Sequence, residues 1–169
     1  MGVFYFLIFR PVKGYRTYTV DEATARMERF CAYRERCHRE VIEKLREMRM
    51  IPEVIDQIIH HLITGNYLNE TRFATSFARG KFRIKKWGRN RIVRELKARE
   101  ISLYNIKLAL KEIPDSEYLE TFHQLAKKRW EALKGEPDPQ RKKRKFYDYL
   151  SYRGWESHLI WEKLGILET

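Results

Sequence analysis

The sequence predicts an all-α protein of three tandem three-helix repeats, each a helix-turn-helix-like unit. Apolar residues recur at helical spacing from residue 20 onward, with no strand-like run among them. The apolar pattern also repeats, first after 51 residues and then after 54. Units of this size bury little apolar surface alone and must stack on their neighbours, so we expect an elongated array that is free to curve.

The repeat is defined by apolar positions that coincide when the chain is shifted along itself. The first copy aligns with the second as follows: Val41, Ile42, Leu45, Met50, Ile55, Ile59 and Leu62 with Ile92, Val93, Leu96, Ile101, Ile106, Leu110 and Ile113. The third copy continues the register with Leu150, Trp155, Ile160 and Leu164. We therefore divide the chain into an extension (1–19) and three repeats (20–64, 65–113 and 114–169).

The extension, residues 1–19, contains an apolar run from Val3 to Phe9. This run is too short to span a membrane, and it lacks the basic segment and cleavage site of a secretory signal. We therefore expect a cytoplasmic protein without membrane contact. The extension itself is interpreted as a hairpin, as a disordered segment, or as the product of a misplaced start codon.

The first repeat, residues 20–64, has recognisable helix ends. Thr19 and Glu22 have the spacing of a capping box, so a helix is expected to begin after Thr19. A second helical pattern follows, and Pro52 suits the first turn of a third helix. Gly65-Asn66 is expected to end that helix.

The second repeat, residues 65–113, carries most of the net positive charge. The formal net charge of the chain is +12, and this repeat has thirteen Lys or Arg against four Asp or Glu. Between Arg72 and Arg99 the only acid is Glu95. Ser102 is placed to cap the last helix of this repeat.

The third repeat, residues 114–169, contains a turn-rich insertion over 135–139, and five consecutive cations then begin a helix. Cations at a helix start oppose the helix dipole, and a helical face rich in like charges repels itself. A solvated face is the alternative, but a phosphate partner would relieve both effects. The candidate contacts are Arg72, Arg79, Lys81, Arg83, Lys85, Lys86, Arg89, Arg91, Arg94, Lys97, Arg141, Lys142, Lys143, Arg144 and Lys145.

Two aromatic residues, Phe82 and Trp87, lie among these cations. Either could stack on nucleic-acid bases, and packing between helices is the alternative for both. Recognition of base sequence is not expected, because Asn105 is the single candidate for reading a base edge on the last helix of the second repeat. The residues alone thus suggest contact with phosphates of single- and double-stranded DNA.

The sequence offers no catalytic or metal-binding constellation. A nuclease would need clustered carboxylates or a His-centred acid and base, and the basic centre has neither. Cys31 and Cys37 are six residues apart, unlike the cysteines of redox or zinc motifs, so we expect reduced, structural thiols. We predict a monomeric protein that is not an enzyme and takes no metal or cofactor.

Four segments resemble the RecX family of recombination regulators. They are Tyr33–Glu40 leading into Leu45, the junction Gly65–Ala74, the segment Lys86–Leu96, and Leu150–Trp155 followed by Ile160. The resemblance itself extends over essentially all of residues 20–165. The chain departs from the family where Arg49 and Glu100 replace a common turn glycine, which Gly154 retains, and where Arg89 replaces a proline.

The resemblance implies a non-enzymatic protein that lies along the groove of the RecA–DNA filament and lowers the ATPase and strand-exchange activities of RecA. It thereby implies roles in DNA recombination, DNA repair and the SOS response. Filament capping and filament destabilisation both remain open as the mechanism. The alternative function is an autonomous DNA-binding protein without sequence preference.

Overall fold

The computed structural model describes residues 17–168, so the predicted hairpin or disorder of residues 1–19 falls almost entirely outside the described residues. Within that range every regular element is a helix. The helices are α1 (Val20–Tyr33), α2 (His38–Glu47), α3 (Pro52–Thr64), α4 (Glu70–Lys85), α5 (Arg89–Lys97), α6 (Leu103–Lys111), α7 (Asp115–Ala132), α8 (Pro139–Tyr152) and α9 (Ser157–Glu168).

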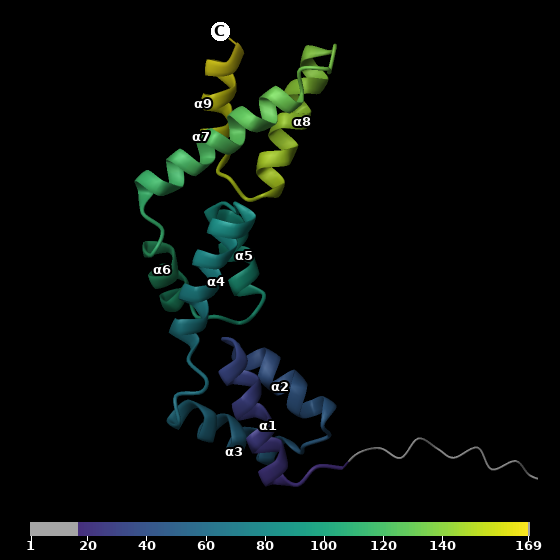
Figure 1. The fold of residues 1–169 in the computed structure, drawn as a ribbon, viewed down its shortest axis with the longest axis vertical. Coiled ribbons are helices and arrows are strands. Elements are labelled where there is room, and N and C mark those ends of the chain that lie inside the picture. The colour runs from purple at the N-terminus through teal and green to yellow at the C-terminus, as the bar shows by residue number, and fades with distance from the viewer. Residues whose placement is uncertain (1–16, 169) are drawn as a thin grey trace, which may run out of the picture.

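The helices form three groups stacked along the longest axis of the molecule (Figure 1). We call α1–α3 unit 1, α4–α6 unit 2 and α7–α9 unit 3. Unit 2 lies between the other two, and the C-terminus lies at the far end of unit 3 (Figure 1). The predicted all-α fold of tandem three-helix repeats is confirmed. None of the described helices combines the length and apolarity needed to cross a bilayer.

Side chains at the helix ends explain where several helices begin. The Thr19 hydroxyl accepts the Glu22 amide at 3.2 Å, and the Glu22 carboxylate accepts the Thr19 amide at 2.9 Å, which confirms the predicted capping box. Pro52 is the first residue of α3. The Ser102 hydroxyl accepts the Asn105 amide at 3.3 Å, so the predicted cap of α6 is also confirmed.

The turn between the second and third helices has the same backbone geometry in all three units. Its central residue is left-handed each time, with φ of 62° at Arg49, 61° at Glu100 and 86° at Gly154. The next amide then donates to a leucine carbonyl five residues earlier, with distances of 3.1 Å for Met50 to Leu45, 3.2 Å for Ile101 to Leu96 and 3.2 Å for Trp155 to Leu150. Offsets of 51 and 54 residues relate these turns, as the apolar register predicted.

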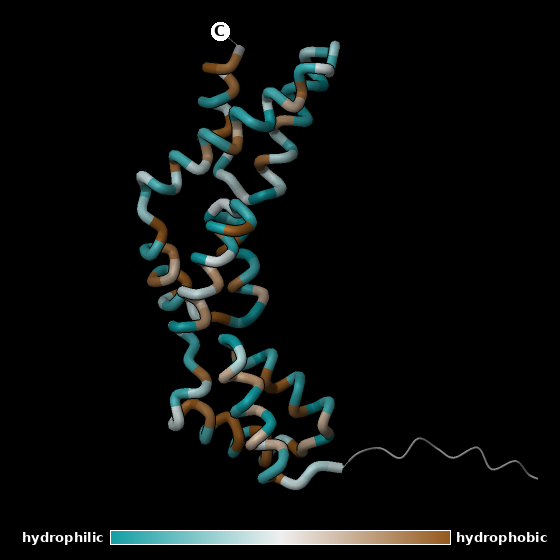
Figure 2. The backbone as a smooth tube through the Cα atoms, viewed as in Figure 1, coloured by the Kyte–Doolittle hydropathy of each residue, from teal (hydrophilic) through white to brown (hydrophobic). Residues whose placement is uncertain are grey.

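Two hydrophobic cores hold the described helices together. Unit 1 has a core of its own, whereas the second core continues without interruption from unit 2 into unit 3. Within this second core the ring of Tyr118 connects units 2 and 3, since its centroid lies 5.8 Å from that of Phe82 and 4.6 Å from that of Trp155. In Figure 2 apolar and polar residues alternate along most helices, as expected when each helix buries one face.

The junction between units 2 and 3 brings two backbone segments into direct contact. The Gly88 amide donates to the Arg153 carbonyl at 2.9 Å, and the Asn90 amide donates to the Gly154 carbonyl at 3.1 Å. A Cβ added to Gly88 would overlap the Gly154 backbone, and one added to Gly154 would overlap Arg91. The start of α5 can therefore dock on the α8–α9 turn only if both residues lack a side chain.

The junction between units 1 and 2 uses an equivalent arrangement. Cys37, which precedes α2 as Gly88 precedes α5, is fully buried and packs in the core of units 2 and 3. Arg39 donates to the Ala98 carbonyl at 2.7 Å, and Arg91 donates to the Tyr152 carbonyl at 3.1 Å. These two carbonyls occupy the same repeat position, so units 1 and 2 each dock the start of their middle helix on the turn of the following unit.

Replacing Glu100 by Gly should raise the free energy of unfolding by about 1 kcal/mol, because left-handed backbone strains a residue that has a Cβ. Lys107→Gly in the middle of α6 is the matched control and should lower it by about 1 kcal/mol. Urea denaturation followed by circular dichroism measures both. A Glu100→Gly variant less stable than the parent would contradict the turn geometry.

Gly88→Ala should lower the free energy of unfolding by about 3 kcal/mol, because the new methyl group separates units 2 and 3. Gly80→Ala is its control, since the Cβ at this position in α4 would meet open space. That control should be more stable than the parent by about 1 kcal/mol. Shifts of the two denaturation midpoints in the same direction would rule out the close backbone contact.

Candidate nucleic-acid interface

The structure separates the predicted cations into three groups. Some are exposed on unit 2, some join one unit to the next, and some lie on α8. Five of them, on α4, on α5 and at the residue that follows α4, are exposed and make no ion pair with other described residues. We call this group the central cationic surface: Arg79, Lys85, Lys86, Arg94 and Lys97.

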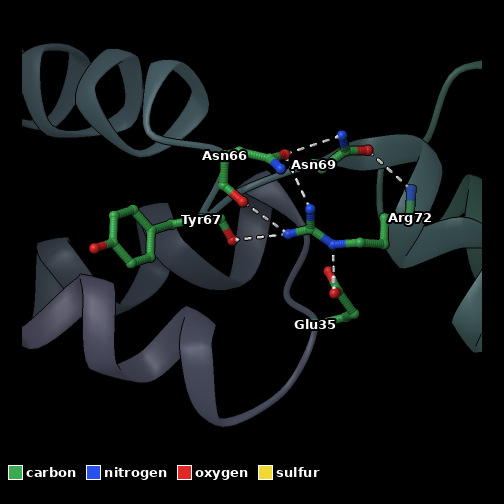
Figure 3. Close-up of polar contacts among 5 residues, drawn as sticks. All are labelled: Glu35, Asn66, Tyr67, Asn69 and Arg72. Atoms are coloured by element: carbon green, nitrogen blue, oxygen red, sulfur yellow. Dashed lines mark hydrogen bonds and ion pairs between the residues drawn. The ribbon is translucent and has the colours of Figure 1, made fainter.

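Arg72 is a predicted contact residue that instead joins units 1 and 2 (Figure 3). Its Nε lies 2.5 Å from the Glu35 carboxylate, which follows α1. Its terminal nitrogens donate to the Asn66 side chain at 2.9 Å, to the Asn66 carbonyl at 3.0 Å and to the Tyr67 carbonyl at 3.4 Å. The Asn69 side-chain oxygen caps α4 by accepting a hydrogen bond from the Arg72 amide at 2.9 Å. A phosphate would have to displace these contacts.

Arg83 and Arg89 make ion pairs between units 2 and 3. Arg83 lies 3.4 Å from Glu117, and Arg89 lies 2.5 Å from Asp115, both acids in the first turn of α7. Acids at a helix start interact favourably with the helix dipole, so these positions suit them even without a partner. The two arginines therefore complete a charged contact at the junction.

The buried Tyr118 side chain extends this contact into the core. Its hydroxyl accepts the Arg89 amide at 2.9 Å and donates to Glu156 at 2.7 Å. Burial, reinforced by the hydrogen bond to Glu156, raises the pKa of Tyr118 well above its usual value. The hydroxyl therefore stays protonated and acts as a fixed hydrogen-bonding bridge between α5, α7 and α9.

Neither predicted stacking residue presents a free ring. Phe82 is buried in the core of units 2 and 3, so its predicted stacking on bases is wrong. Trp87 is partly buried, with the Arg91 guanidinium 4.1 Å from the centre of its ring. The same guanidinium lies 4.5 Å from the centre of the Tyr152 ring, so Arg91 also helps to join unit 2 to unit 3.

Lys81 stands between the central cationic surface and the packed aromatic residues. Its ammonium lies 5.2 Å from the ring centres of both Phe77 and Trp87. It also lines a groove of about 430 Å³ between units 1 and 2. The groove walls include Ile84, whose side chain is 77% exposed, and Lys85. An apolar side chain next to cations suits a partner that offers both phosphate and protein surface.

The five cations of α8 lie on unit 3, well apart from α4 and α5 along the molecule (Figure 1). Lys145 pairs with Glu136 at 2.5 Å, Arg144 lies 3.8 Å from Asp148, and the Lys142 ammonium lies 3.9 Å from the Trp130 ring centre. Arg141 is exposed, and Lys143 is partly buried. The predicted cations of α8 thus form a region separate from the central cationic surface.

Among the described residues, the titratable side chains form no cluster that could bind a metal ion. No three His, Cys, Asp or Glu side chains within residues 17–168 are placed to hold a metal ion. Cys31 and Cys37 are buried and unpaired, in line with the predicted structural thiols. Burial raises the pKa of Cys31 to about 11, so this thiol stays protonated near neutral pH.

Sequence reasoning missed several residues that shape this interface. Tyr152 is 70% exposed beside Arg91, and Arg153 donates to the Lys85 carbonyl at 2.5 Å across the junction. Arg39 was not among the predicted contact residues, yet it donates to the Ala98 carbonyl in the turn of unit 2. The repeat could have identified such contacts, because Ala98 and Tyr152, whose carbonyls accept hydrogen bonds from Arg39 and Arg91, coincide after a shift of 54 residues.

Fold and charge together define a class: an elongated protein of tandem three-helix units with a cationic middle. Two family models match the chain. One is described as "RecX, second three-helix domain" and matches residues 69–110, and the other is described as "RecX, third three-helix domain" and matches residues 115–164. The chain is 31% identical to "Regulatory protein RecX" of Chlorobium phaeobacteroides over 138 residues, covering 80% of this chain and 87% of that protein. The chain therefore belongs to the RecX family.

Other relatives extend the comparison. "Regulatory protein RecX" of Clostridioides difficile is 30% identical over 63% of this chain, which spans only 50% of that relative; the chain likewise spans 51% of the Lactobacillus gasseri relative. The crystal structure of RecX from Lactobacillus salivarius has a TM-score of 0.74 and 22% identity over 88% of this chain and 96% of that one. That likeness supports the fold.

Changing Lys85, Lys86, Arg94 and Lys97 together to Glu should abolish binding to a labelled 30-nucleotide dT oligomer without unfolding the protein. Each phosphate contact to a single strand contributes about 0.7 to the slope of log affinity against log salt, so roughly 3 should be lost if weak binding persists. Fluorescence anisotropy across a salt series measures this change.

The matched control places the same four charge reversals outside the central cationic surface, at Lys107, Lys111, Lys127 and Lys128, which are all exposed. It removes the same net charge and should keep most of the affinity and most of the salt slope. Equal losses in both variants would mean that net charge, rather than the central cationic surface, accounts for binding.

Proposed function

We propose that this protein is a non-enzymatic regulator that binds the RecA–DNA filament and lowers the ATPase and recombinase activities of RecA. The observation that carries the proposal is membership of a family whose curated members are named regulatory proteins, in a chain built as a long array. An array of stacked units offers contacts spread along one direction, as a repeating filament does.

The distribution of charge supports a mixed partner. The central cationic surface suits DNA phosphates, while the groove between units 1 and 2 also contains apolar side chains such as Phe77 and Ile84. Contacts that are individually weak add within one molecule when the sites lie on one rigid filament. Binding to assembled filament should therefore be much tighter than binding to free RecA or to bare DNA.

A second candidate function is that of an autonomous DNA-binding protein without sequence preference. The observation that favours it is the presence of five exposed cations on the central cationic surface. Base reading has little support, because the Asn105 side chain already accepts a hydrogen bond from the Thr71 hydroxyl at 2.7 Å. The two functions differ in what they compete with, which makes them separable.

Titration of the DNA-dependent ATPase of RecA with the full chain, at several total DNA concentrations, separates the two functions. A filament regulator should inhibit at a ratio set by RecA and should keep inhibiting when DNA is added. A protein that only coats DNA should need enough copies to cover the lattice, and added DNA should overcome it. The second pattern would reject the filament proposal.

The four-Glu variant of the central cationic surface and its matched control belong in the same titration. We expect the surface variant to need at least tenfold more protein for half inhibition, whereas the control should stay within about threefold of the parent. Equal inhibition by both variants would remove the central cationic surface from the mechanism, while leaving the choice between filament and DNA to the DNA titration.

A further inference from the structure

One face of α4 carries a row of polar side chains. They recur at intervals of three and four residues, which places them on one side of the helix. We call them the α4 polar row: Arg72, Thr75, Ser76, Arg79 and Arg83. A hollow of about 430 Å³ lies along the first four of these residues. Guanidinium and hydroxyl groups all donate hydrogen bonds, so the row presents donors along its whole length.

Acids from the neighbouring units occupy both ends of the α4 polar row. Glu35 of unit 1 lies 2.5 Å from Arg72, and Glu117 of unit 3 lies 3.4 Å from Arg83. Arg79 lies between them, is exposed and makes no ion pair with other described residues. The row therefore has an internal carboxylate at each end and an open cation in the middle.

The Glu35 carboxylate is only half satisfied in this contact. One oxygen accepts a hydrogen bond from the Arg72 Nε, whereas the other is buried and has no hydrogen-bond donor among the described residues (Figure 3). A buried oxygen without a donor loses the hydrogen bonds that water would give it. Glu35 regains this hydration when it leaves Arg72, so its exchange for another anion costs less than the short distance suggests.

The linker between α3 and α4 positions Arg72 independently of Glu35. The terminal nitrogens of Arg72 donate to the Asn66 side chain and to the carbonyls of Asn66 and Tyr67 (Figure 3). These acceptors are uncharged, and they hold the side of the guanidinium that does not face Glu35. An anion that takes the place of Glu35 thus meets a positioned guanidinium, which lowers the entropy lost on binding.

The ion pair at the other end of the row is weak for a different reason. The Arg83 and Glu117 side chains are 58% and 39% exposed, and their separation exceeds that of a strong charge-assisted hydrogen bond. Exposed ion pairs of this kind contribute little to stability. By contrast, Arg89 lies closer to Asp115 and also donates to a backbone carbonyl. Glu117 is therefore the more easily displaced of the two α7 acids.

The layout of the row indicates the class of anion that fits it. Along the helix axis, Arg79 lies about 10 Å beyond Arg72, and Arg83 lies about 6 Å beyond Arg79. A nucleic-acid strand presents phosphates in series, and the guanidinium fork matches the oxygens of a phosphate. Arg79 also belongs to the central cationic surface, so the row is continuous with the candidate nucleic-acid interface. An acidic peptide has no such regular series of anions.

We propose that Glu35 and Glu117 are internal substitutes for phosphate, which a nucleic-acid strand displaces when it binds the α4 polar row. The phosphates then contact Arg72, Arg79 and Arg83. Because the strand must first displace two carboxylates, the acids lower the affinity for bare DNA and leave the protein free to reach assembled filament. The inference rests on the proposed function and adds how its contact with DNA is regulated.

The first test removes the two competing charges. The double variant Glu35→Gln, Glu117→Gln should bind the labelled 30-nucleotide dT oligomer roughly tenfold more tightly at low salt, with about threefold from each substitution, because no exposed ion pair has to be broken. Fluorescence anisotropy measures the affinity, and circular dichroism confirms the fold.

The matched control is Glu53→Gln, Glu112→Gln, which makes the same change in net charge. Both acids are exposed, and neither makes an ion pair with another described residue. Charges away from the row are screened by salt, so the control should stay within about twofold of the parent. Equal affinities of the two double variants would overturn the proposal.

The second test asks whether a paired arginine contacts phosphate in the complex. Arg83→Gln and Arg79→Gln should each lower the slope of log affinity against log salt by about 0.7, because each loses one phosphate contact. Lys44→Gln is the control, since Lys44 is also ion-paired but lies on unit 1 away from the row. A slope for Arg83→Gln equal to that for Lys44→Gln would mean that Arg83 stays with Glu117, and displacement would be rejected.

Two further outcomes would also overturn the proposal. Poly-glutamate that displaces the oligomer, and that gains equally in Glu35→Gln, Glu117→Gln, would make the row a site for an acidic protein. A parent chain that does not bind the oligomer would leave the acids nothing to regulate. Inhibition of the RecA ATPase is measured separately, so its persistence in either case would retain the filament proposal while this one fails.

Discussion

The contact between the backbones of Gly88 and Gly154 sets the arrangement of the second half of the molecule. It places the start of α5 on the α8–α9 turn through two hydrogen bonds, from the Gly88 amide and from the Asn90 amide. Only at that separation can the Tyr118 hydroxyl bridge Arg89 and Glu156, and only then can one core run from Phe82 to Trp155. A missing side chain at two positions thus allows two units to share one interior.

Positive charge has two different uses along this chain. Arg72, Arg89 and Arg91 hold units together, because a guanidinium can donate several hydrogen bonds and also stack on an aromatic ring. Lysines such as Lys85 and Lys86 stay exposed on the central cationic surface. Three of the five cations of the central cationic surface are lysines, whose side chains are poorly suited to planar, multiple hydrogen bonding. Charge available to a partner is therefore smaller than the net charge of unit 2 suggests.

The repeat register, the helix caps and the three-unit fold could be predicted because each depends on residues close together in the sequence. Thr19 and Glu22 are three residues apart, and Val41 and Leu45 lie on one helical turn. Whether each cation is exposed or paired could not be predicted, because Arg72 contacts a carboxylate 37 residues away and Arg91 contacts a carbonyl 61 residues away. Such pairs form only when the units pack against each other, so the number of charges in the sequence does not predict them.

The two junctions of the array differ in the forces that hold them. Units 2 and 3 share a continuous apolar core, so separating them would expose large side chains such as Phe82 and Trp155 to water. Unit 1 has its own core and meets unit 2 through Cys37, Arg39 and the contacts of Arg72. Ion pairs and hydrogen bonds near a surface contribute less than apolar burial of this extent. The first junction is therefore the easier one to deform, and a partner that contacted all three units would act mainly on the angle between unit 1 and the rest.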